Sequence, residues 1–306
     1  MGLQSSGAIS LNEIHIEAGG SSGTQASIND SDIRALIDKS SGAQMSFSEW
    51  YGASASINET LSNGDTNVNV STEFGSSVFT SNTAKVLIIP SGSEVGATGG
   101  TGNRAITVPS GMGGTLTIQN AGTISGAGGT GGQPHVNGNA GGSAIYIASN
   151  NVTVTNTGTI RGGGGGGGAG HYGSTGGSVS TSIVNCVGGS YGYGGAGGNG
   201  QGYNSAATNG AGGSGGGARV AYLQAYPGSP NAGPSAIICG NYSGWTNGGS
   251  GYTGGNGGSF GQPGSDGAGP SSTGNYTGGA AGKYIELASG ISYTLSNSGT
   301  VSGNAP

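Results

Sequence analysis

The residue types that most often carry chemistry are scarce in this chain of 306 residues and stand far apart. His15, His135 and His171 show no metal-ligand spacing, so we interpret them as surface or structural side chains. The G-x-S-x-G, H-E-x-x-H and C-x-x-C motifs do not occur. A G-x-G-x-x-G match within 126–132 lacks a following helix and a ribose-binding acid. The sequence therefore predicts no catalytic residue, no metal site and no cofactor.

The remaining reactive groups leave two questions open. A glycan-cleaving enzyme needs two carboxylates across the scissile bond, whereas the region 161–282 contains one acid, Asp266. Paired acids from outside that region keep the enzyme as an alternative. Cys186 and Cys239 permit one disulfide without requiring it, and their apolar neighbours favour buried thiols.

Aromatic side chains are the positive signal. Nine of the 13 tyrosines fall within 161–282, together with only three charged residues. Antibody loops favour tyrosine, serine, glycine and asparagine, because tyrosine offers a flat apolar face and a hydroxyl at low entropic cost. We expect some of these rings to pack over glycine backbone and others to be presented to a ligand, with 218–247 as the first choice for a recognition surface. The candidate binding residues are Tyr172, Tyr191, Tyr193, Tyr203, Tyr222, Tyr226, Tyr242, Trp245, Tyr252, Phe260 and Tyr276.

Composition excludes several classes of protein. The chain contains 75 glycines and only 6% charged residues, against about 25% in ordinary globular domains. The net charge of −5 and the lack of a Lys/Arg cluster argue against binding to nucleic acid or to an anionic membrane. No apolar run approaches the roughly 20 residues of a membrane span, and the first residues do not resemble a signal peptide.

Residues 1–55 predict a small mixed module that packs on a partner. A theme of serine beside a large apolar residue, followed by a residue of helix-capping type, recurs at Ser10, Ser27 and Ser46. We expect one helix from Asp30 to about Lys39, capped by Asn29 and with Ile33, Leu36 and Ile37 on its apolar face.

Residues 56–160 predict a β-scaffold. Asn63-Gly64 indicates a two-residue hairpin between 57–61 and 66–70, and 78–79 and 86–89 read as further short strands. The pattern N-x-G-T-[I/V]-x-G follows an alternating strand three times, at Asn120, Asn156 and Asn297. Since two copies precede the glycine-rich region and one follows it, we expect 161–282 to be an insertion whose chain returns to the scaffold at 283–306.

The glycine-rich region itself predicts a bundle of polyglycine-II helices. Glycine runs at 162–170, 188–200, 210–217, 248–258 and 274–282 lack the strict period and the proline of collagen. A polyproline-II-type helix forms no internal hydrogen bonds, so its N–H and C=O groups need neighbouring backbones, which glycine allows to approach. The intervening segments, 171–187, 201–209, 218–247 and 259–273, would be loops at the ends. The predicted fold is therefore mainly β with a polyglycine-II bundle.

Several of these features resemble bacteriophage tail-fibre proteins. The opening L-Q-S-S-G-A-I-S-L-N-E-I-H-I-E and the later S-G-A-Q-M-S-F-S-E-W-Y-G-A are similar to an N-terminal segment of phage tail proteins. The stretch N-T-G-T-I-R-G-G-G-G-G-G-G-A-G and the alternation of glycine runs with aromatic segments are similar to the distal adhesins of T-even-type phages. The resemblance implies a virion protein of the tail fibre or tail tip, with a polyglycine-II scaffold that displays loops to a bacterial receptor.

The favoured interpretation is thus a tail-fibre adhesin that binds an outer-membrane protein or a surface glycan and attaches to other tail or fibre proteins through its N-terminal module. A homo-oligomer, such as a trimer, is a further possible assembly. The alternatives are a structural fibre or sheath subunit that assembles through its glycine-rich block, a glycan-cleaving fibre protein and, most weakly, an ice-binding protein.

Overall fold

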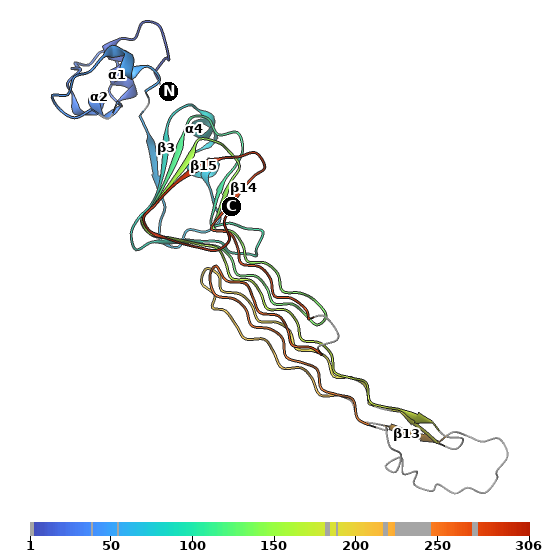
Figure 1. The fold of residues 1–306 in the computed structure, drawn as a ribbon. Helices are drawn as coiled ribbons and strands as arrows, with labels where there is room; N and C mark the ends of the chain where they lie inside the picture. The colour runs from blue at the N-terminus through green and yellow to red at the C-terminus, as the bar shows by residue number, and fades with distance from the viewer. Residues whose placement is uncertain are drawn as a thin grey trace, which may run out of the picture.

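The chain folds into three successive parts, as a computed structural model shows (Figure 1). A small N-terminal module is followed by a strand-rich body, from which long glycine-rich segments extend away from the module (Figure 1). The structure describes residues 3–37, 39–53, 55–180, 184–187, 189–216, 220–223, 246–270 and 275–306.

The N-terminal module has its own small core. Ile14, Ile33 and Trp50 are fully buried at its centre, and the indole N–H of Trp50 donates to the Ile33 carbonyl at 3.3 Å. Its elements are α1 (Leu11–Glu17), α2 (Ser31–Ala35) and the 3-10 helix η1 (Phe47–Trp50).

One serine–carboxylate hydrogen bond recurs before all three elements. In each, a serine backbone N–H donates to the carboxylate three residues later: Ser10–Glu13 at 2.7 Å, Ser27–Asp30 at 2.7 Å and Ser46–Glu49 at 2.6 Å. At α1 and η1 the serine is the N-cap and the bond is part of a capping box, whereas Ser27 lies in the turn before α2, whose N-cap is Asp30. The recurring serine theme therefore caps two helices and shapes the turn that leads into the third.

The helix expected from Asp30 to Lys39 is shorter than predicted, and its cap is different. It covers Ser31–Ala35 with Asp30 at the N-cap, while the Asn29 side chain accepts from Arg34 Nη1 at 2.8 Å. The Arg34 side chain is 2% exposed and donates to the carbonyls of Ser40 and Ala43. Because those carbonyls must fold back around the guanidinium, the chain leaves the helix early.

The body is a three-sided solenoid of parallel strands. A complete coil of the chain adds one strand to each of three sheets. Strands that follow one another in the sequence therefore lie in different sheets. The first sheet contains β1 (Ile57–Thr60), β3 (Lys85–Ile89), β6 (Leu116–Asn120), β9 (Val152–Asn156) and β15 (Tyr293–Asn297). The second contains β4 (Glu94–Gly96), β7 (Thr123–Ser125), β10 (Thr159–Arg161) and β16 (Thr300–Ser302). The third contains β2 (Val68–Asn69), β5 (Ile106–Val108), β8 (Ile145–Ile147) and β14 (Ile285–Leu287).

Two predictions about the first coil are wrong. Asn63-Gly64 does not join a hairpin, because β1 pairs in parallel with β3 and β2 pairs in parallel with β5. The Asn63 side chain instead accepts from the backbone N–H of Glu94 in the next coil at 2.9 Å. Residues 78–79 lie in α4 (Ser76–Thr80), which follows α3 (Val70–Glu73). The buried Phe79 brings this helix into the solenoid core, so tertiary burial outweighs the strand propensity of Val and Phe.

The N-x-G-T repeat makes the corner between the first and second sheets. Each asparagine ends one strand, and the threonine three residues later begins the next, so equivalent residues stack from coil to coil. The amide of Asn120 donates to Asn156 Oδ1 at 2.7 Å, and the amide of Asn156 donates to Asn297 Oδ1 at 2.7 Å. Asn156 is fully buried, and this asparagine ladder satisfies polar groups that would otherwise be costly inside the core.

Lys85 is a second buried polar group in the solenoid. It is 1% exposed, and its Nζ donates to the carbonyls of Ser81 at 3.1 Å, Thr83 at 2.7 Å and Gly113 at 2.9 Å. Burial lowers the pKa of this amine, because the charged form loses its hydration. The three carbonyls hold the chain at the start of the first complete coil.

The asparagine ladder predicts unequal effects along its length. Asn156→Ala should lower the free energy of unfolding by about 2 kcal/mol, since it removes the ladder bonds to both the buried Asn120 and Asn297. Asn297→Ala, at the exposed end of the ladder, should cost less. Urea denaturation followed by far-UV circular dichroism measures both, and equal losses would contradict the ladder.

The capping carboxylates predict that the module weakens in acid. The backbone N–H of Ser10 lowers the pKa of Glu13, and Lys39 together with Ser46 lowers that of Glu49, from an ordinary 4.5. A carboxyl group with a lowered pKa in the folded state stabilises the fold above its unfolded pKa, and this contribution is lost as pH falls through the folded value. In a Trp245→Phe background, Trp50 fluorescence should report module unfolding at lower denaturant below about pH 4.5. The double substitution Glu13→Gln, Glu49→Gln should flatten that dependence.

Candidate functional site

The glycine-rich segments form a backbone lattice with a three-residue repeat. The segment 162–177, here called the central segment, runs antiparallel to 189–202. Gly164, Gly167 and Gly170 donate to carbonyls of 189–202, each at 2.8 Å. Three residues per turn is the repeat of a polyproline-II-type helix, whereas a β-ladder repeats every two.

The central segment is bonded on all sides. It donates in rotation to three neighbours, shown by Gly163 to Gly142 at 2.9 Å, Gly164 to Gln201 at 2.8 Å and Gly165 to Gln262 at 3.0 Å. It accepts from three others, shown by Gly129 to Gly164 at 2.8 Å, Gly258 to Gly165 at 2.8 Å and Gly282 to Gly163 at 2.8 Å. Six neighbouring segments therefore surround it, and residues 162–171 are all buried.

Glycine is needed here for space rather than for unusual dihedral angles. A Cβ built on any residue of 162–168 would lie 1.8 to 2.2 Å from a carbonyl oxygen of a neighbour. Among the described glycines from 162 to 258, none has a φ in the left-handed region. The close approach of bare backbones thus explains the seven-glycine run.

The lattice is wider than the sequence indicated. Residues 126–132 and 136–142, which the sequence assigned to the scaffold, form two of the six neighbours: Gly132 donates to Gly167, and Gly166 donates to Asn139. The predicted loop 171–187 also begins within the lattice, because Gly173 and Gly176 donate to Gly192 and Gly189. The missed signal was the three-residue spacing of Gly126, Gly129 and Gly132.

Two of the predicted binding residues lie at the junction with the solenoid. The Tyr203 ring covers Gly96 so closely that a Cβ there would lie 1.9 Å from a ring carbon. The guanidinium of Arg161 lies 3.8 Å from the Phe260 ring centroid and pairs with Glu94 at 2.9 Å. The turns that contain Tyr203 and Phe260 therefore lie at the lattice base, where these two rings pack, whereas residues 262–268 of the predicted loop 259–273 run along the central segment as part of the lattice.

Other aromatic side chains meet on the flank of the lattice. We call this set the aromatic ledge: His135, His171, Tyr172, Tyr191, Tyr193 and Tyr276. The ring centroids are separated by 5.6 Å for Tyr193–Tyr191, 5.0 Å for Tyr191–Tyr172, 5.1 Å for Tyr172–His135, 5.5 Å for Tyr172–His171, 6.0 Å for His135–Tyr276 and 4.8 Å for His171–Tyr276. Tyr172, Tyr191 and Tyr193 remain 42%, 37% and 57% exposed. Six rings from three lattice segments and one turn thus form a continuous, partly exposed surface.

The ledge lies where the lattice becomes narrower. The last bonds from the central segment to its short neighbours are Ala169 to Val136 and His171 to Ala268. Beyond that level the central segment bonds only with 189–202 and 246–258 within the described residues, through Gly173, Gly176 and the carbonyl of Ser174. The shorter segments, 126–132, 136–142, 259–268 and 275–282, therefore end before the central segment, 189–202 and 246–258 do, which leaves a step on the flank of the lattice. His135 and Tyr276 lie at this step, beside the longer segments.

Polar atoms complete the ledge. His135 Nδ1 lies 3.1 Å from the Tyr276 hydroxyl, and His171, 8% exposed, stacks against the Tyr276 ring. Sequence reasoning treated the histidines as isolated because 135 and 171 show no useful spacing. The hydrogen-bond register of two lattice segments brings both rings against Tyr172, which the sequence pattern does not display.

The remaining predicted residues are placed in part. Tyr252 is 39% exposed, and its backbone N–H donates to the His171 carbonyl at 2.7 Å. Tyr222 lies in β13 (Val220–Leu223), which forms an antiparallel sheet with β12 (Val184–Val187) and β11 (Val179–Ser180). Tyr226, Tyr242 and Trp245, with most of the segment 218–247, lie outside the described residues, as does Cys239. Their role, and the state of the cysteines, stay predictions.

The described residues contain no helix long and apolar enough to cross a membrane. The same part of the chain holds no cluster of three His, Cys, Asp or Glu side chains that could ligate a metal ion.

A parallel solenoid that extends into a glycine lattice with exposed aromatic rings defines a mainly-β fibre protein, as the sequence predicted in outline. The family model described as phage tail fibre adhesin Gp38 matches residues 54–306, and the chain belongs to that family. It is therefore a bacteriophage tail-fibre protein of the virion, which confirms the resemblance seen in the sequence. The match begins just after the N-terminal module.

A solved structure supports the same fold. A chain described as "Crystal structure of the gp37-gp38 adhesin tip complex of the bacteriophage S16 long tail fiber" is similar over 96% of this chain and 96% of that chain, with 21% sequence identity and a TM-score of 0.54. No curated protein matches the chain.

The packing of the central segment predicts opposite outcomes for two glycine substitutions. Gly165→Ala should lower the free energy of unfolding by about 3 kcal/mol, because its Cβ would meet the Gly279 carbonyl oxygen at 1.9 Å. Gly215→Ala, whose Cβ meets nothing within 4 Å, should be neutral or slightly stabilising. Thermal unfolding of the full chain measures both, and similar melting temperatures for the two variants would refute the lattice packing.

Proposed function

We propose that this chain binds a bacterial surface receptor for the phage, through aromatic side chains that the glycine lattice holds in place. Membership in an adhesin family supports the adhesin role. The observation that carries the finer proposal is the presence of exposed tyrosines on segments that backbone hydrogen bonds join to their neighbours in the lattice. Interfaces favour such rings because they bury large areas at low entropic cost. The chemistry is binding, with no bond made or broken.

The three-residue hydrogen-bond repeat supports a polyglycine-II bundle as the scaffold for binding. In this proposal 1–55 attach the protein to the fibre, 56–160 without the glycine-rich 126–142 form the scaffold, and 283–306 return to it. Residues 161–282, joined by 126–142, carry the recognition surface. The backbone bonds of the lattice do not depend on the residues in its turns, so those residues can vary while the spacing of the turns persists.

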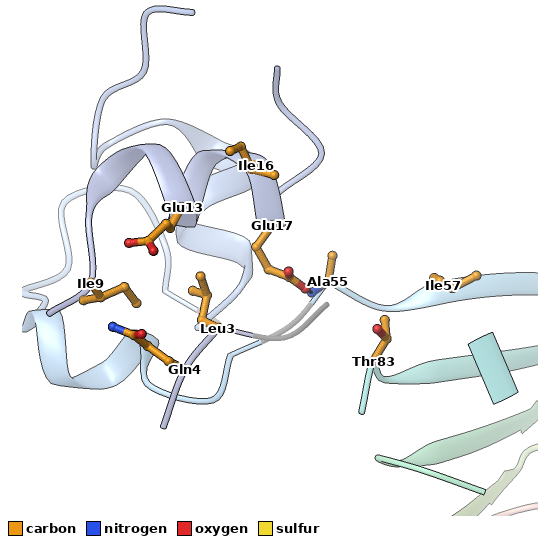
Figure 2. A pocket seen from close by; sticks show the side chains of 9 residues that line it. All are labelled: Leu3, Gln4, Ile9, Glu13, Ile16, Glu17, Ala55, Ile57 and Thr83. Atoms are coloured by element: carbon orange, nitrogen blue, oxygen red, sulfur yellow. Dashed lines mark hydrogen bonds between the residues drawn. The ribbon is translucent and has the colours of Figure 1, made fainter. Parts of the chain in front are cut away.

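The N-terminal module is the proposed attachment site to another tail-fibre protein. The similar solved chain comes from a complex described as gp37-gp38, a precedent for such a partner. The module and the first solenoid strand flank an open pocket of about 530 Å³, with Leu3, Ile9, Ile16 and Ile57 on its wall (Figure 2). The Glu17 side chain of α1 accepts a hydrogen bond from the Ala55 N–H at 3.1 Å, which ties the module to the chain that leads into β1. Ile16 is 45% exposed at this pocket, so an apolar segment of a partner has a place to pack.

Two variants separate attachment from receptor binding. Ile16→Lys should reduce incorporation into virions at least tenfold while the purified protein still binds host cells, with Ser41→Lys, at an exposed turn, as the matched control. Deletion of 218–247 should do the reverse, leaving incorporation intact and abolishing binding to cells. Counting protein per virion by immunoblot and measuring adsorption to cells gives both results. If the deletion blocks assembly and adsorption together, the chain is a structural subunit and the proposal fails.

A further inference from the structure

We infer that the aromatic ledge is a binding site for a neutral saccharide chain of the bacterial surface, separate from the segment 218–247. This inference rests on the proposed function, since it names a ligand class for one part of the adhesin. It concerns the flank of the lattice, at the step where the short segments end.

The shape of the ledge suits a chain of flat units. Four successive ring contacts lead from Tyr193 to Tyr276, through either His171 or His135, at 4.8 to 6.0 Å between centroids. That spacing is comparable with the span of one pyranose ring, so consecutive sugars can each meet an aromatic face. An apolar globular ligand would need an enclosing pocket, whereas Tyr172, Tyr191 and Tyr193 are 42%, 37% and 57% exposed and stand open to solvent.

The chemistry of the ledge also favours sugars. The C–H face of a pyranose stacks on an aromatic ring, while its hydroxyl groups seek donors and acceptors at the edge. Tyrosine hydroxyls and imidazole nitrogens supply both roles. His135 and Tyr276 already make such a bond at 3.1 Å. A purely hydrophobic partner would cover the hydroxyl groups of the exposed Tyr172, Tyr191 and Tyr193 without offering them a hydrogen bond, at a cost.

Charge determines which surface molecules fit. The six ledge residues carry no formal charge when histidine is neutral. The described charged residues of 161–282 are Arg161, which pairs with Glu94 at the lattice base, and Asp266, which accepts from the Gly278 N–H at 2.9 Å. An anionic headgroup or phosphorylated glycan would find no cation on the ledge, because recognition of anions relies on Arg and Lys. The geometry therefore points to an uncharged polysaccharide.

The ledge is held ready before a ligand arrives. Tyr172 follows the buried His171, and Gly173 next to it donates to Gly192 between Tyr191 and Tyr193. These backbone bonds fix the relative positions of three tyrosines on two segments. Rings already in place lose little conformational entropy when a ligand binds, which favours affinity for a weakly attractive ligand such as a sugar.

The test uses the full-length protein and neutral oligosaccharide fragments released from the surface polysaccharide of a strain to which it binds. Isothermal titration should show saturable binding, which Tyr172→Ala weakens at least tenfold and Tyr172→Phe weakens less, because the phenyl face remains. Tyr51→Ala is the matched control, since Tyr51 is similarly exposed at 38% and lies in the N-terminal module, away from the ledge. Unchanged circular dichroism and melting temperature establish that the variants are folded, and Tyr191→Ala serves as a second ledge variant if Tyr172→Ala unfolds.

The outcomes separate this inference from the proposed function. If the wild-type protein binds cells but not the oligosaccharides, or if ledge variants and Tyr51→Ala bind them equally, the saccharide site is refuted and the adhesin proposal stands. If ledge variants lose binding to a purified outer-membrane protein in nanodiscs and keep oligosaccharide binding, the ledge is a protein-binding surface and the inference fails. If the wild-type protein does not bind cells at all, the adhesin proposal itself fails.

Discussion

The backbone of Gly162–Gly168 satisfies its hydrogen bonds only through other segments, and the architecture beyond the solenoid depends on that constraint. The hydrogen bonds of this run all go to other segments and repeat every three residues, so every N–H and C=O of the run depends on a neighbour. Six surrounding segments supply them, and each must lie close enough for a carbonyl oxygen to occupy the space where a Cβ would stand. The conformational entropy that so much glycine loses on folding is offset by this dense set of backbone bonds.

The solenoid provides the template on which that lattice starts. Three strands of the second sheet end in register at Ser125, Arg161 and Ser302, and the chain passes directly from the first two into lattice segments. Gly126 donates to the Arg161 carbonyl and Gly162 to the Ser302 carbonyl, both at 2.8 Å, so the ladder of the sheet continues into the lattice. The lattice chain returns to the third sheet at β8 and β14. Strand spacing in the solenoid thus sets the initial spacing of the glycine backbones, and the asparagine ladder beside this corner keeps the coils in line.

The differences between sequence expectation and structure share one cause. Asn63-Gly64 was expected to close a hairpin, and it does form a turn, but the strands on either side pair with coils more distant in sequence. Tyr203 and Phe260 belong to aromatic segments between glycine runs. Because the chain runs out and back along the lattice, its turns alternate between the two ends, and these two residues lie in turns at the base. His135 appeared isolated because its partners, His171, Tyr172 and Tyr276, come from three other parts of the chain. Local patterns identify turns and strands, whereas pairing in a parallel structure is decided between distant segments.

The sequence by itself determined the strand-forming repeats, the capping pairs of the N-terminal module and the need of the glycine-rich region for backbone neighbours, because each is a property of adjacent residues. The class of protein followed from those features. Only the tertiary structure decided which segments neighbour the run Gly162–Gly168 and where the shorter lattice segments end. It also decided which rings meet in the aromatic ledge beside those ends. The physical reason is that glycine segments carry almost no side-chain information about register. The register of these segments is set by the points at which the chain leaves the solenoid and returns to it. The hydrogen bonds between the segments do not fix it, because any glycine could make them.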